Sequence, residues 1–358
     1  MKKVLYKVLL SVNVIFAFTL LLSYLAVHIS PEKFVLPAFF GLAYPYLLLI
    51  NILLIITWAV LLKYEALISV IVIVAGYSHL ANYFRLSRPD GEKDGTFQVL
   101  SYNVRLFNAF ERGKGSEKSV IDFLGKQQPD ILCLQEFYGT GNPNQKVSEI
   151  RDHLGPGYHF HMKMIGSGRN RYYGIVTYSR FPIIGRGEII HPRSPGLTIY
   201  TDILIKKDTF RIFNNHLQSF KLKSMEKSFI EELSRQEEGK TLGEMKELSL
   251  SLKNGFTRRA QQAELVKGQI NLSRYPVIVT GDFNDTPVSY TYSRIRKGLS
   301  DAFVNSGYGA GFTYRGNYPA NRIDYILFDD ALECKSFDIL KVRYSDHYPV
   351  AAYFTVKR

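Results

Sequence analysis

The first quarter of the chain is almost continuously apolar, whereas the rest alternates between short apolar runs and polar turns. Three runs without a charged residue occur at 8–27, 34–62 and 66–84, and they are 20, 29 and 19 residues long. About 20 apolar residues in a helix cross the hydrocarbon core of a bilayer. The pattern therefore predicts a membrane anchor at 1–84 with two or three transmembrane helices, of which the third is the weakest because it contains His79 and Asn82.

The start of the chain is compatible with a signal peptide as well as with an anchor. Basic residues followed by an apolar run are common to both, but no small-residue cleavage site ends the first run and a second run follows at once. We therefore favour an uncleaved anchor. Basic residues at the N-terminus and Lys63 predict a cytoplasmic start, which after three spans puts the rest of the chain on the extracytoplasmic side. The opposite orientation is favoured by the basic residues after the third run, namely Arg85, Arg88 and Lys93.

Beyond a polar linker at 85–96, the pattern changes to short runs rich in Val, Ile, Tyr, Phe and Thr, which are typical of strands. We predict strands at 97–104, 131–136, 173–179, 198–205, 209–216, 277–283, 323–328 and 350–356. A helix is expected at 119–126 between the first two strands. The mixture of strands and helices indicates one α/β or α+β domain over 97–358.

The longest helical pattern covers 222–270 and is strongly charged. Gly239, Asn254 and Gly255 are expected to interrupt it, because glycine and asparagine disfavour the interior of a helix. We predict that the part at 257–270 packs one face on a sheet and that the part at 222–253 is a mobile surface insertion.

The charge of the chain is concentrated after the apolar runs. The formal net charge is +13, and residues 1–94 contain only eight Lys or Arg and five Asp or Glu, so the remainder carries +10. A basic domain attracts phosphoesters, nucleic acids or acidic lipid headgroups, although a solvated basic surface has the same composition. The two cysteines, Cys133 and Cys334, lack a CxxC or Cys/His neighbour, so a zinc site is not expected.

Polar residues recur directly after the apolar runs, where strand ends present functional groups on a rigid scaffold. Asn103 ends the run in Ser-Tyr-Asn-Val, and Glu136 ends Ile-Leu-Cys-Leu-Gln-Glu. A carboxylate buried there is costly unless it is paired, and a hard cation such as Mg²⁺ would resolve that cost. The alternative is an exposed glutamate. His216 ends a third strand, where a lone histidine is more often structural than catalytic.

The segment Thr-Gly-Asp-Phe-Asn-Asp at 280–285 is the most specific of these motifs. Asp282 and Asn284 are two residues apart, so on a strand their side chains point to the same face. Aspartate accepts a proton or holds a water molecule, and asparagine donates to an anionic oxygen. Gly281 allows close approach of the backbone, and Phe283 is expected to point into the core.

Two further motifs follow near the end of the chain. Asp324 lies in an otherwise apolar strand, so it needs a buried partner, for which a histidine would serve. Asp346 and His347 come just before the last strand. Ser345, Asp346 and His347 do not form a Ser-His-Asp triad, because adjacent side chains point apart on an extended chain.

These motifs, in this order, resemble the endonuclease/exonuclease/phosphatase superfamily of DNase I-like, metal-dependent phosphohydrolases. They are Ser-Tyr-Asn-Val (101–104), Leu-Gln-Glu (134–136), Asn-His-Leu (215–217), Gly-Asp-Phe-Asn (281–284), Ile-Asp-Tyr-Ile (323–326) and Ser-Asp-His-Tyr-Pro-Val (345–350). The resemblance covers about 97–356 and leaves out the apolar runs. It implies a four-layer sandwich, in which two packed β-sheets are flanked by helices.

The resemblance also implies a metal site. Glu136 would bind Mg²⁺ or Mn²⁺, assisted by Asn103 and Asp346. Some members of the family carry an acidic residue two positions after the equivalent of Asn103, as a further metal ligand. This chain has Arg105 there, which cannot bind a cation, so a second metal is in doubt. Arg105 is expected to bind a substrate phosphate, or else to form a surface salt bridge.

The remaining roles follow from the same resemblance. Asp282 would orient and deprotonate the attacking water, and Asn284 and His216 would contact the phosphoryl oxygens of the substrate. His347 would stabilise the developing charge, oriented by Asp324. Positioning and charge stabilisation of this kind account for most of the catalysis of phosphoryl transfer.

We therefore predict a membrane-anchored phosphoester hydrolase that depends on a divalent cation and needs no obligate protein partner. Its substrate would be a phosphodiester or phosphomonoester, in a phospholipid headgroup, a nucleic acid or a small phosphate ester. The membrane anchor favours a lipid over the alternative of a nuclease. A second alternative is an inactive, membrane-tethered scaffold on the same fold, but every motif position is filled.

Overall fold

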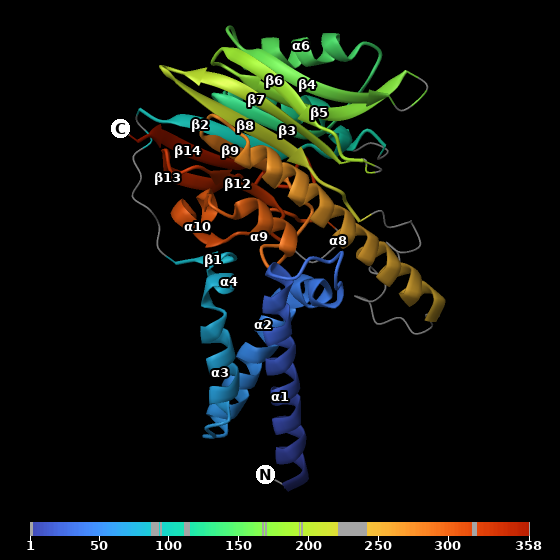
Figure 1. Ribbon diagram of the computed structural model, residues 1–358, viewed down its shortest axis with the longest axis vertical. Helices are drawn as coiled ribbons and strands as arrows, with labels where there is room; N and C mark the ends of the chain where they lie inside the picture. The colour runs from blue at the N-terminus through green and yellow to red at the C-terminus, as the bar shows by residue number, and fades with distance from the viewer. Residues whose placement is uncertain are drawn as a thin grey trace.

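The structure is a computed structural model in which a layered β-sandwich stands on a bundle of apolar helices (Figure 1). It describes residues 3–86, 93, 95–110, 115–166, 168, 170–192, 194, 196–220, 242–316 and 321–357. The part of the predicted insertion at 222–241 and most of the predicted linker lie outside the described residues.

Two six-stranded sheets form the sandwich. The first has the order β13-β14-β2-β3-β5-β4, with bounds Leu332–Ile339, Val350–Val356, Phe97–Asn103, Ile131–Thr140, Arg171–Ser179 and His159–Gly166. The second has the order β10-β12-β9-β8-β7-β6, with bounds Ser300–Asp301, Asp324–Phe328, Val277–Asp282, Asp208–His216, Leu197–Ile205 and Ile183–Ile189. Each sheet contains one parallel pair, β2 with β3 and β8 with β9, among antiparallel neighbours.

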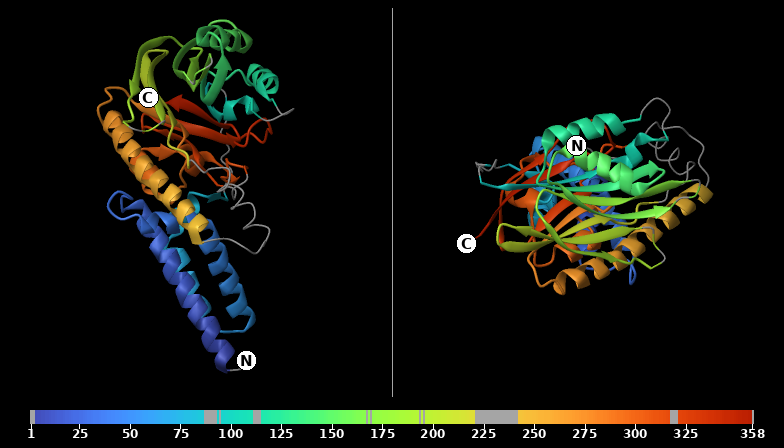
Figure 2. Two further views of the ribbon diagram at one scale, coloured as in Figure 1. Left: turned by 90° about the vertical axis from the view of Figure 1, so that its right-hand side faces the viewer. Right: turned by 90° about the horizontal axis from the view of Figure 1, so that it is seen from above.

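Alternating side chains of the strands build three apolar layers. In β2, Val99 packs between the two sheets, whereas Leu100 faces the helices on the outside, as expected for the two-residue period of a strand. The outer face of the first sheet is covered by α5 (Glu117–Gln127) and α6 (Pro143–Leu154). The second sheet is covered by α8 (Leu242–Asn271) and α9 (Tyr290–Arg296) (Figure 2, right). The predicted four-layer sandwich is therefore confirmed.

All eight predicted strands are present, but the four edge strands of the two six-stranded sheets were not predicted, namely β4, β6, β10 and β13. The expected interruption of the long helix at Asn254 and Gly255 is wrong, because α8 is continuous through both. Tertiary packing explains the difference. A Cβ on Gly255 would lie 2.6 Å from the ring of Phe220, so the glycine allows this aromatic residue to pack on the helix. That contact outweighs the cost of about 1 kcal/mol for a glycine inside a helix.

The N-terminal bundle, residues 3–84, contains α1 (Lys3–Tyr24), the short η1 (Leu25–Val27), α2 (Leu36–Val60), α3 (Ala66–Ala75), α4 (Tyr77–Ala81) and the residues that follow α4. Two segments, Lys3–Val27 and Leu36–Val60, are long and apolar enough to cross a membrane by length and composition. The third predicted run is divided at Gly76 into α3 and α4. With 10 residues, α3 is only about 15 Å long and is too short to cross by itself.

The bundle encloses a small polar cluster within its apolar core and is apolar on its surface. Asn13, Asn51, Ser69 and Trp58 are fully buried between the helices. Asn13 Oδ1 accepts a hydrogen bond from Trp58 Nε1 at 2.9 Å, and Ser69 donates to Asn51 Oδ1 at 2.8 Å. Large apolar side chains instead face outward, among them Val14, Ile15, Phe18, Leu49, Ile56 and Ile71.

Candidate active site

Three neighbouring strands of the second sheet end side by side and carry polar residues in register. His216 of β8 is paired with Asp282 of β9, and Asp282 is paired with Asp324 of β12. The strand ends predicted from the sequence therefore lie next to one another at one edge of this sheet. Asp282 and Asp324 are each only 1% exposed.

A glycine allows β8 and β9 to approach closely just before this edge. Gly281 has a φ of 123°, and a Cβ added to it would lie 2.0 Å from the carbonyl oxygen of Asn215. Only glycine adopts this conformation without strain. The close approach expected from the sequence at this position is confirmed.

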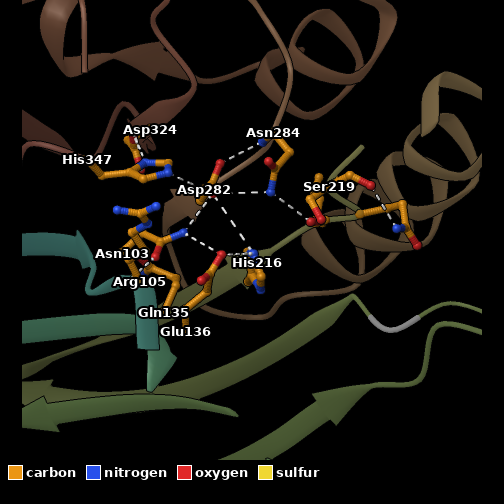
Figure 3. A network of polar contacts seen from close by, with 12 residues as sticks. Asn103, Arg105, Gln135, Glu136, His216, Ser219, Asp282, Asn284, Asp324 and His347 are labelled. Atoms are coloured by element: carbon orange, nitrogen blue, oxygen red, sulfur yellow. Dashed lines mark hydrogen bonds and ion pairs between the residues drawn. The ribbon is translucent and has the colours of Figure 1, made fainter. Parts of the chain in front are cut away.

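The first sheet contributes Asn103 from the end of β2 and Glu136 from the middle of β3. The pairing of β3 with β5 shifts register between Leu134 and Phe137, and Glu136 has a φ of 50°. This bulge adds a residue to β3 and re-aims its side chain. As a result, Gln135 is fully buried between the sheets, whereas Glu136 is only partly buried and points toward Asp282 (Figure 3).

The side chains from the two sheets meet in one cluster. Asn103 Nδ2 donates to Glu136 Oε1 at 3.2 Å and to Asp282 Oδ2 at 2.9 Å. His216 Nε2 lies 3.3 Å from Glu136 Oε1 and 4.0 Å from Asp282 Oδ2. Asn284 donates to both oxygens of Asp282, through its backbone N–H at 2.7 Å and its side-chain amide at 3.1 Å.

His347 completes the cluster from the loop before β14. Its Nδ1 lies 3.0 and 3.1 Å from the two oxygens of Asp324, and its Nε2 lies 3.8 Å from Asp282 Oδ2. The buried aspartate therefore has the histidine partner that the sequence predicted. Ser345 hydrogen-bonds the carbonyl oxygen of Asn103 at 2.8 Å and takes no part in a serine triad.

Arg105 and Asp346 lie beside this cluster and pair with each other, with Arg105 Nε 3.2 Å from Asp346 Oδ2. Residues 105–108, assigned to η2 (Arg105–Asn108), all have φ between 48° and 54°. Successive left-handed residues other than glycine are unfavourable, and strain of this kind persists where the surroundings enforce it, commonly at functional sites. The expected salt bridge of Arg105 is thus present.

Burial and neighbouring charges perturb the pKa values of the cluster in opposite directions. Burial raises the pKa of Asp282 to about 6, against the attraction of His347. Burial also disfavours the charged form of Glu136, but the hydrogen bond and charge of His216 lower the pKa of that carboxyl to about 2. Burial opposes the charge on His347, yet the two aspartates, Asp324 and Asp282, raise its pKa to about 10. Acids and bases with separated pKa values are typical of catalytic sites.

The donor set fits a hard divalent cation. One candidate group of ligands consists of Glu136, His216 and Asp282, whose ligand atoms lie within 4.8 Å of one another. Carboxylate oxygens dominate it, as Mg²⁺ or Mn²⁺ prefers. The resemblance assigned Asp346 to the metal. Its carboxylate is not in this group of three ligands and pairs with Arg105.

Several buried residues that support the site were not predicted. Gln135 Nε2 donates to Asn214 Oδ1 at 2.8 Å and to Ser101 Oγ at 3.1 Å, which joins the two sheets behind Glu136. Thr313 Oγ1 accepts hydrogen bonds from the backbone N–H groups of Ile323 and Asp324, both at 3.1 Å. Gln135 and Asn214 lie one and two positions before the predicted site residues Glu136 and His216, which was the only signal available for them.

A family model described as Endonuclease/Exonuclease/phosphatase family matches residues 100–347. A second model, described as a domain of unknown function (DUF8431), matches residues 6–83. No curated protein matches the sequence. The first match covers all of the predicted site residues.

Solved structures share the fold of the sandwich. An endonuclease/exonuclease/phosphatase family protein from Bacteroides thetaiotaomicron is 19% identical with a TM-score of 0.54, and the alignment covers 74% of this chain and 98% of that chain. A mannosyl-6-phosphatase from the same organism is 20% identical with a TM-score of 0.51, covering 72% and 99%. The human Nocturnin catalytic domain with bound sulfate anion is 17% identical with a TM-score of 0.52, covering 76% and 100%.

Proposed function

Since the chain belongs to the endonuclease/exonuclease/phosphatase family, whose members are metal-dependent hydrolases of phosphoester bonds, we propose that it is a membrane-anchored hydrolase of phosphoesters presented at a membrane surface. One observation carries the proposal. Glu136, His216, Asp282 and His347, which come from four separate segments of both sheets, form one continuous cluster with contacts of 4.0 Å or less.

Glu136 is the principal metal ligand in this proposal, and the low pKa of its carboxyl keeps it charged at neutral pH. Asn103 and Asp346 assist it. The amide of Asn103 faces Glu136 through its nitrogen, so its oxygen would bind a cation after the amide rotates. Asp346 would divide its oxygens between the metal and Arg105. Bound Mg²⁺ or Mn²⁺ would polarise the phosphoryl group and neutralise its charge.

Asp282 is the proposed general base. Two hydrogen bonds from Asn284 fix its carboxylate, and its raised pKa of about 6 suits proton transfer near neutral pH. His347 is the proposed source of positive charge for the phosphoryl oxygens or the leaving group. It is charged at neutral pH because of its raised pKa, and Asp324 fixes the orientation of its ring.

His216, Asn284 and Arg105 are the proposed contacts to the substrate. Burial lowers the pKa of His216, but the hydrogen bond that its ring donates to Glu136 and the charges of Glu136 and Asp282 outweigh burial, so the net direction is upward. A charged imidazole and an amide beside Asp282 can bind phosphoryl oxygens. The guanidinium of Arg105 is 41% exposed and lies at the rim, where a substrate phosphate can exchange with Asp346.

The N-terminal bundle supports membrane anchoring. Its surface carries large apolar side chains and its apolar core encloses a small buried polar cluster, whereas a water-soluble helical bundle has a polar surface. A cleaved signal peptide would remove α1 and leave Ser69 and Trp58 without their partner Asn13. Both observations favour an anchor that is retained.

The arrangement of the bundle supports an extracytoplasmic catalytic domain. Tyr6 hydrogen-bonds Glu65, so the N-terminus and the turn after α2 share the end of the bundle that is remote from the sandwich (Figure 1). That end carries Lys3, Lys7 and Lys63. Basic residues favour the cytoplasmic side, so the sandwich at the other end would face outward.

The test is a panel of phosphoesters offered to the full-length protein in lipid nanodiscs, with Mg²⁺ and with EDTA. The panel would contain diacyl phospholipids and sphingomyelin in the membrane, and inositol phosphates, a single-stranded oligonucleotide and plasmid DNA in solution. We expect turnover that requires the metal and is fastest on a lipid. Fastest turnover on DNA would support the nuclease alternative instead.

Two variants provide the matched comparison. Asp282→Asn should reduce the metal-dependent rate by at least about 10³-fold, because it removes the proposed base without changing its shape. Asp152→Asn should not change the rate, since that side chain is 67% exposed and lies on α6. Wild-type turnover in Asp282→Asn, or the absence of turnover on every substrate by the wild type, would refute the proposal.

A further inference from the structure

The N-terminal bundle does more than hold the sandwich at a membrane. We propose that the bundle is a positioning element of the active site, which holds the segments that carry His347, Asp324 and Asp282 in their catalytic arrangement. This inference rests on the proposed function. It goes beyond it because an anchor alone requires only a covalent link to the catalytic domain.

The first connection begins where the chain leaves the bundle. Phe84–Arg85 forms the strand β1, which pairs with β11 (Gly309–Ala310) of the sandwich. The next backbone contact is a hydrogen bond of 2.8 Å from the N–H of Gly311 to the carbonyl oxygen of Tyr83. The ring of Phe312 then packs against the rings of Tyr83 and Phe84, at centroid distances of 6.4 and 5.9 Å.

The connector segment, residues 309–314, leads from these contacts directly to the catalytic pair. Thr313 is fully buried, and its hydroxyl oxygen accepts the backbone N–H of Asp324 at 3.1 Å. Its carbonyl oxygen accepts the N–H of Tyr348 at 2.7 Å, one residue after His347. Tyr314 forms a β-bridge with His347, and the two rings lie 5.1 Å apart. The connector segment therefore touches both partners of the Asp324–His347 pair.

A second connection reaches the loop that follows Asp282 and Asn284. Val288 is fully buried and belongs to the apolar cluster of the bundle. A Cβ on Gly41 of α2 would lie 2.3 Å from the carbonyl oxygen of Val288, so the helix and this loop are in direct backbone contact. Thr286 Oγ1 also donates to the carbonyl oxygen of Gly41 at 3.5 Å.

A third contact fixes the bundle next to β12. The carbonyl oxygen of Asn82 accepts a hydrogen bond of 2.9 Å from Arg322, which is fully buried and paired with Asp301. The side-chain oxygen of Asn82 accepts another from Arg296 at 2.8 Å. Arg322 stands two residues before Asp324 in the chain. The bundle thus contacts the loop after Asp282 and the segment before Asp324, and the connector segment links it to His347.

These contacts differ from passive docking in what their loss does to catalysis. Passive docking affects stability, whereas a positioning contact affects the rate of the chemical step. A shift of a catalytic group by about 1 Å lowers the rate by as much as about 10²-fold. The affinity for the substrate should change less, because the proposed substrate contacts Arg105 and His216 do not touch the bundle in any contact described above.

The test uses full-length protein in nanodiscs and a soluble chromogenic phosphodiester, so that presentation of a lipid substrate plays no part. Phe312→Ala removes the ring that joins the connector segment to the bundle. We expect kcat to fall about tenfold while KM stays within about twofold, and Phe312→Leu should recover most of kcat. The matched control is Phe160→Ala, since Phe160 is also partly buried and has one ring contact of 6.3 Å, with Tyr178 on the first sheet.

A second pair of variants probes the bundle side. Gly41→Val places a side chain against Val288, whereas Ala59→Val enlarges an exposed side chain of the same helix. Only Gly41→Val should lower kcat. Wild-type kcat in folded Phe312→Ala and Gly41→Val, or an equal loss in Phe160→Ala or Ala59→Val, overturns the inference. An inactive wild type would instead refute the proposed function, so the two failures are distinguishable.

Discussion

Replacing Asp324 by asparagine tests how the buried aspartate acts on His347. The substitution keeps the size and shape of the side chain but removes its charge. Asp324 Oδ1 and Oδ2 both lie within 3.1 Å of His347 Nδ1, and the two residues are 1% and 5% exposed. The charge therefore acts through little water, and the effect on the imidazole should be large.

The magnitude follows from the raised pKa of His347. The pKa rises from its usual 6.5 to about 10 although burial opposes the charge. This difference corresponds to about 5 kcal/mol, at about 1.4 kcal/mol for each pH unit. Asp324 is the nearer of the two aspartates that attract the ring, so it should supply about half, and Asp324→Asn should lower the pKa of His347 by about two pH units.

The assay is the pH dependence of kcat/KM with Mg²⁺. A group with a raised pKa is charged below that pKa, so activity that needs charged His347 is lost as the pH rises through it. Asp324→Asn should move this alkaline limb down by about two pH units and lower the maximal rate by about 10²- to 10³-fold. Asp330→Asn, at an exposed position after the same strand, should change neither. An unmoved limb in Asp324→Asn would refute the reasoning, whatever happens to the maximal rate.

Three other predictions concern stability and metal binding. Asp301→Asn should lower the free energy of unfolding by about 3 to 5 kcal/mol in chemical denaturation, because it leaves the fully buried Arg322 without its charge partner. Burial opposes the charge of Asp301, but Arg322 lowers the pKa of this carboxyl overall. The stabilisation by Asp301 is therefore present above about pH 4 and is lost as the pH falls through the lower pKa of the folded state. An unfolding free energy that does not change from about pH 2 to pH 6 would contradict this. Gly281→Ala should cost at least about 2 kcal/mol in the same experiment, because the new Cβ would overlap the carbonyl of Asn215. Glu136→Gln should raise the Mg²⁺ concentration for half-maximal rate by more than about tenfold, and an unchanged magnesium titration would exclude Glu136 as a ligand.

The strands of the sandwich could be predicted because most of them are buried. β2 and β9 are buried throughout, and runs rich in Val, Ile, Leu and aromatic residues mark them in the sequence. The four strands of the two six-stranded sheets that were missed are the edge strands β4, β6, β10 and β13. β6 mixes Gly, Arg and Glu with its isoleucines, so its sequence lacks the alternation that identifies a strand. β4 does alternate polar and apolar residues, but it is only partly buried and is built of His, Met and Lys rather than of β-branched residues.

The residues of the candidate site were predictable in identity but not in arrangement. The motifs after apolar runs indicated Asp282, His216 and Glu136. The register of the strands then brings Asp282 and His216 side by side. The bulge that turns Glu136 away from Gln135 could not be predicted, since it depends on pairing with β5. The contact of Gly41 with Val288 was equally hidden, because it joins segments almost 250 residues apart, and the separation is much longer than any local pattern.

The buried polar cluster of Asn13, Asn51 and Ser69 affects how the bundle assembles during synthesis. Asn13 of α1 leaves the ribosome long before Ser69 of α3, with which it shares a hydrogen bond in the finished bundle. An unpaired amide in lipid is unfavourable, so α1 gains its full stability only when the later helices arrive. Biogenesis of the anchor should therefore be cooperative, and a chain stopped before α3 should be a substrate for membrane quality control.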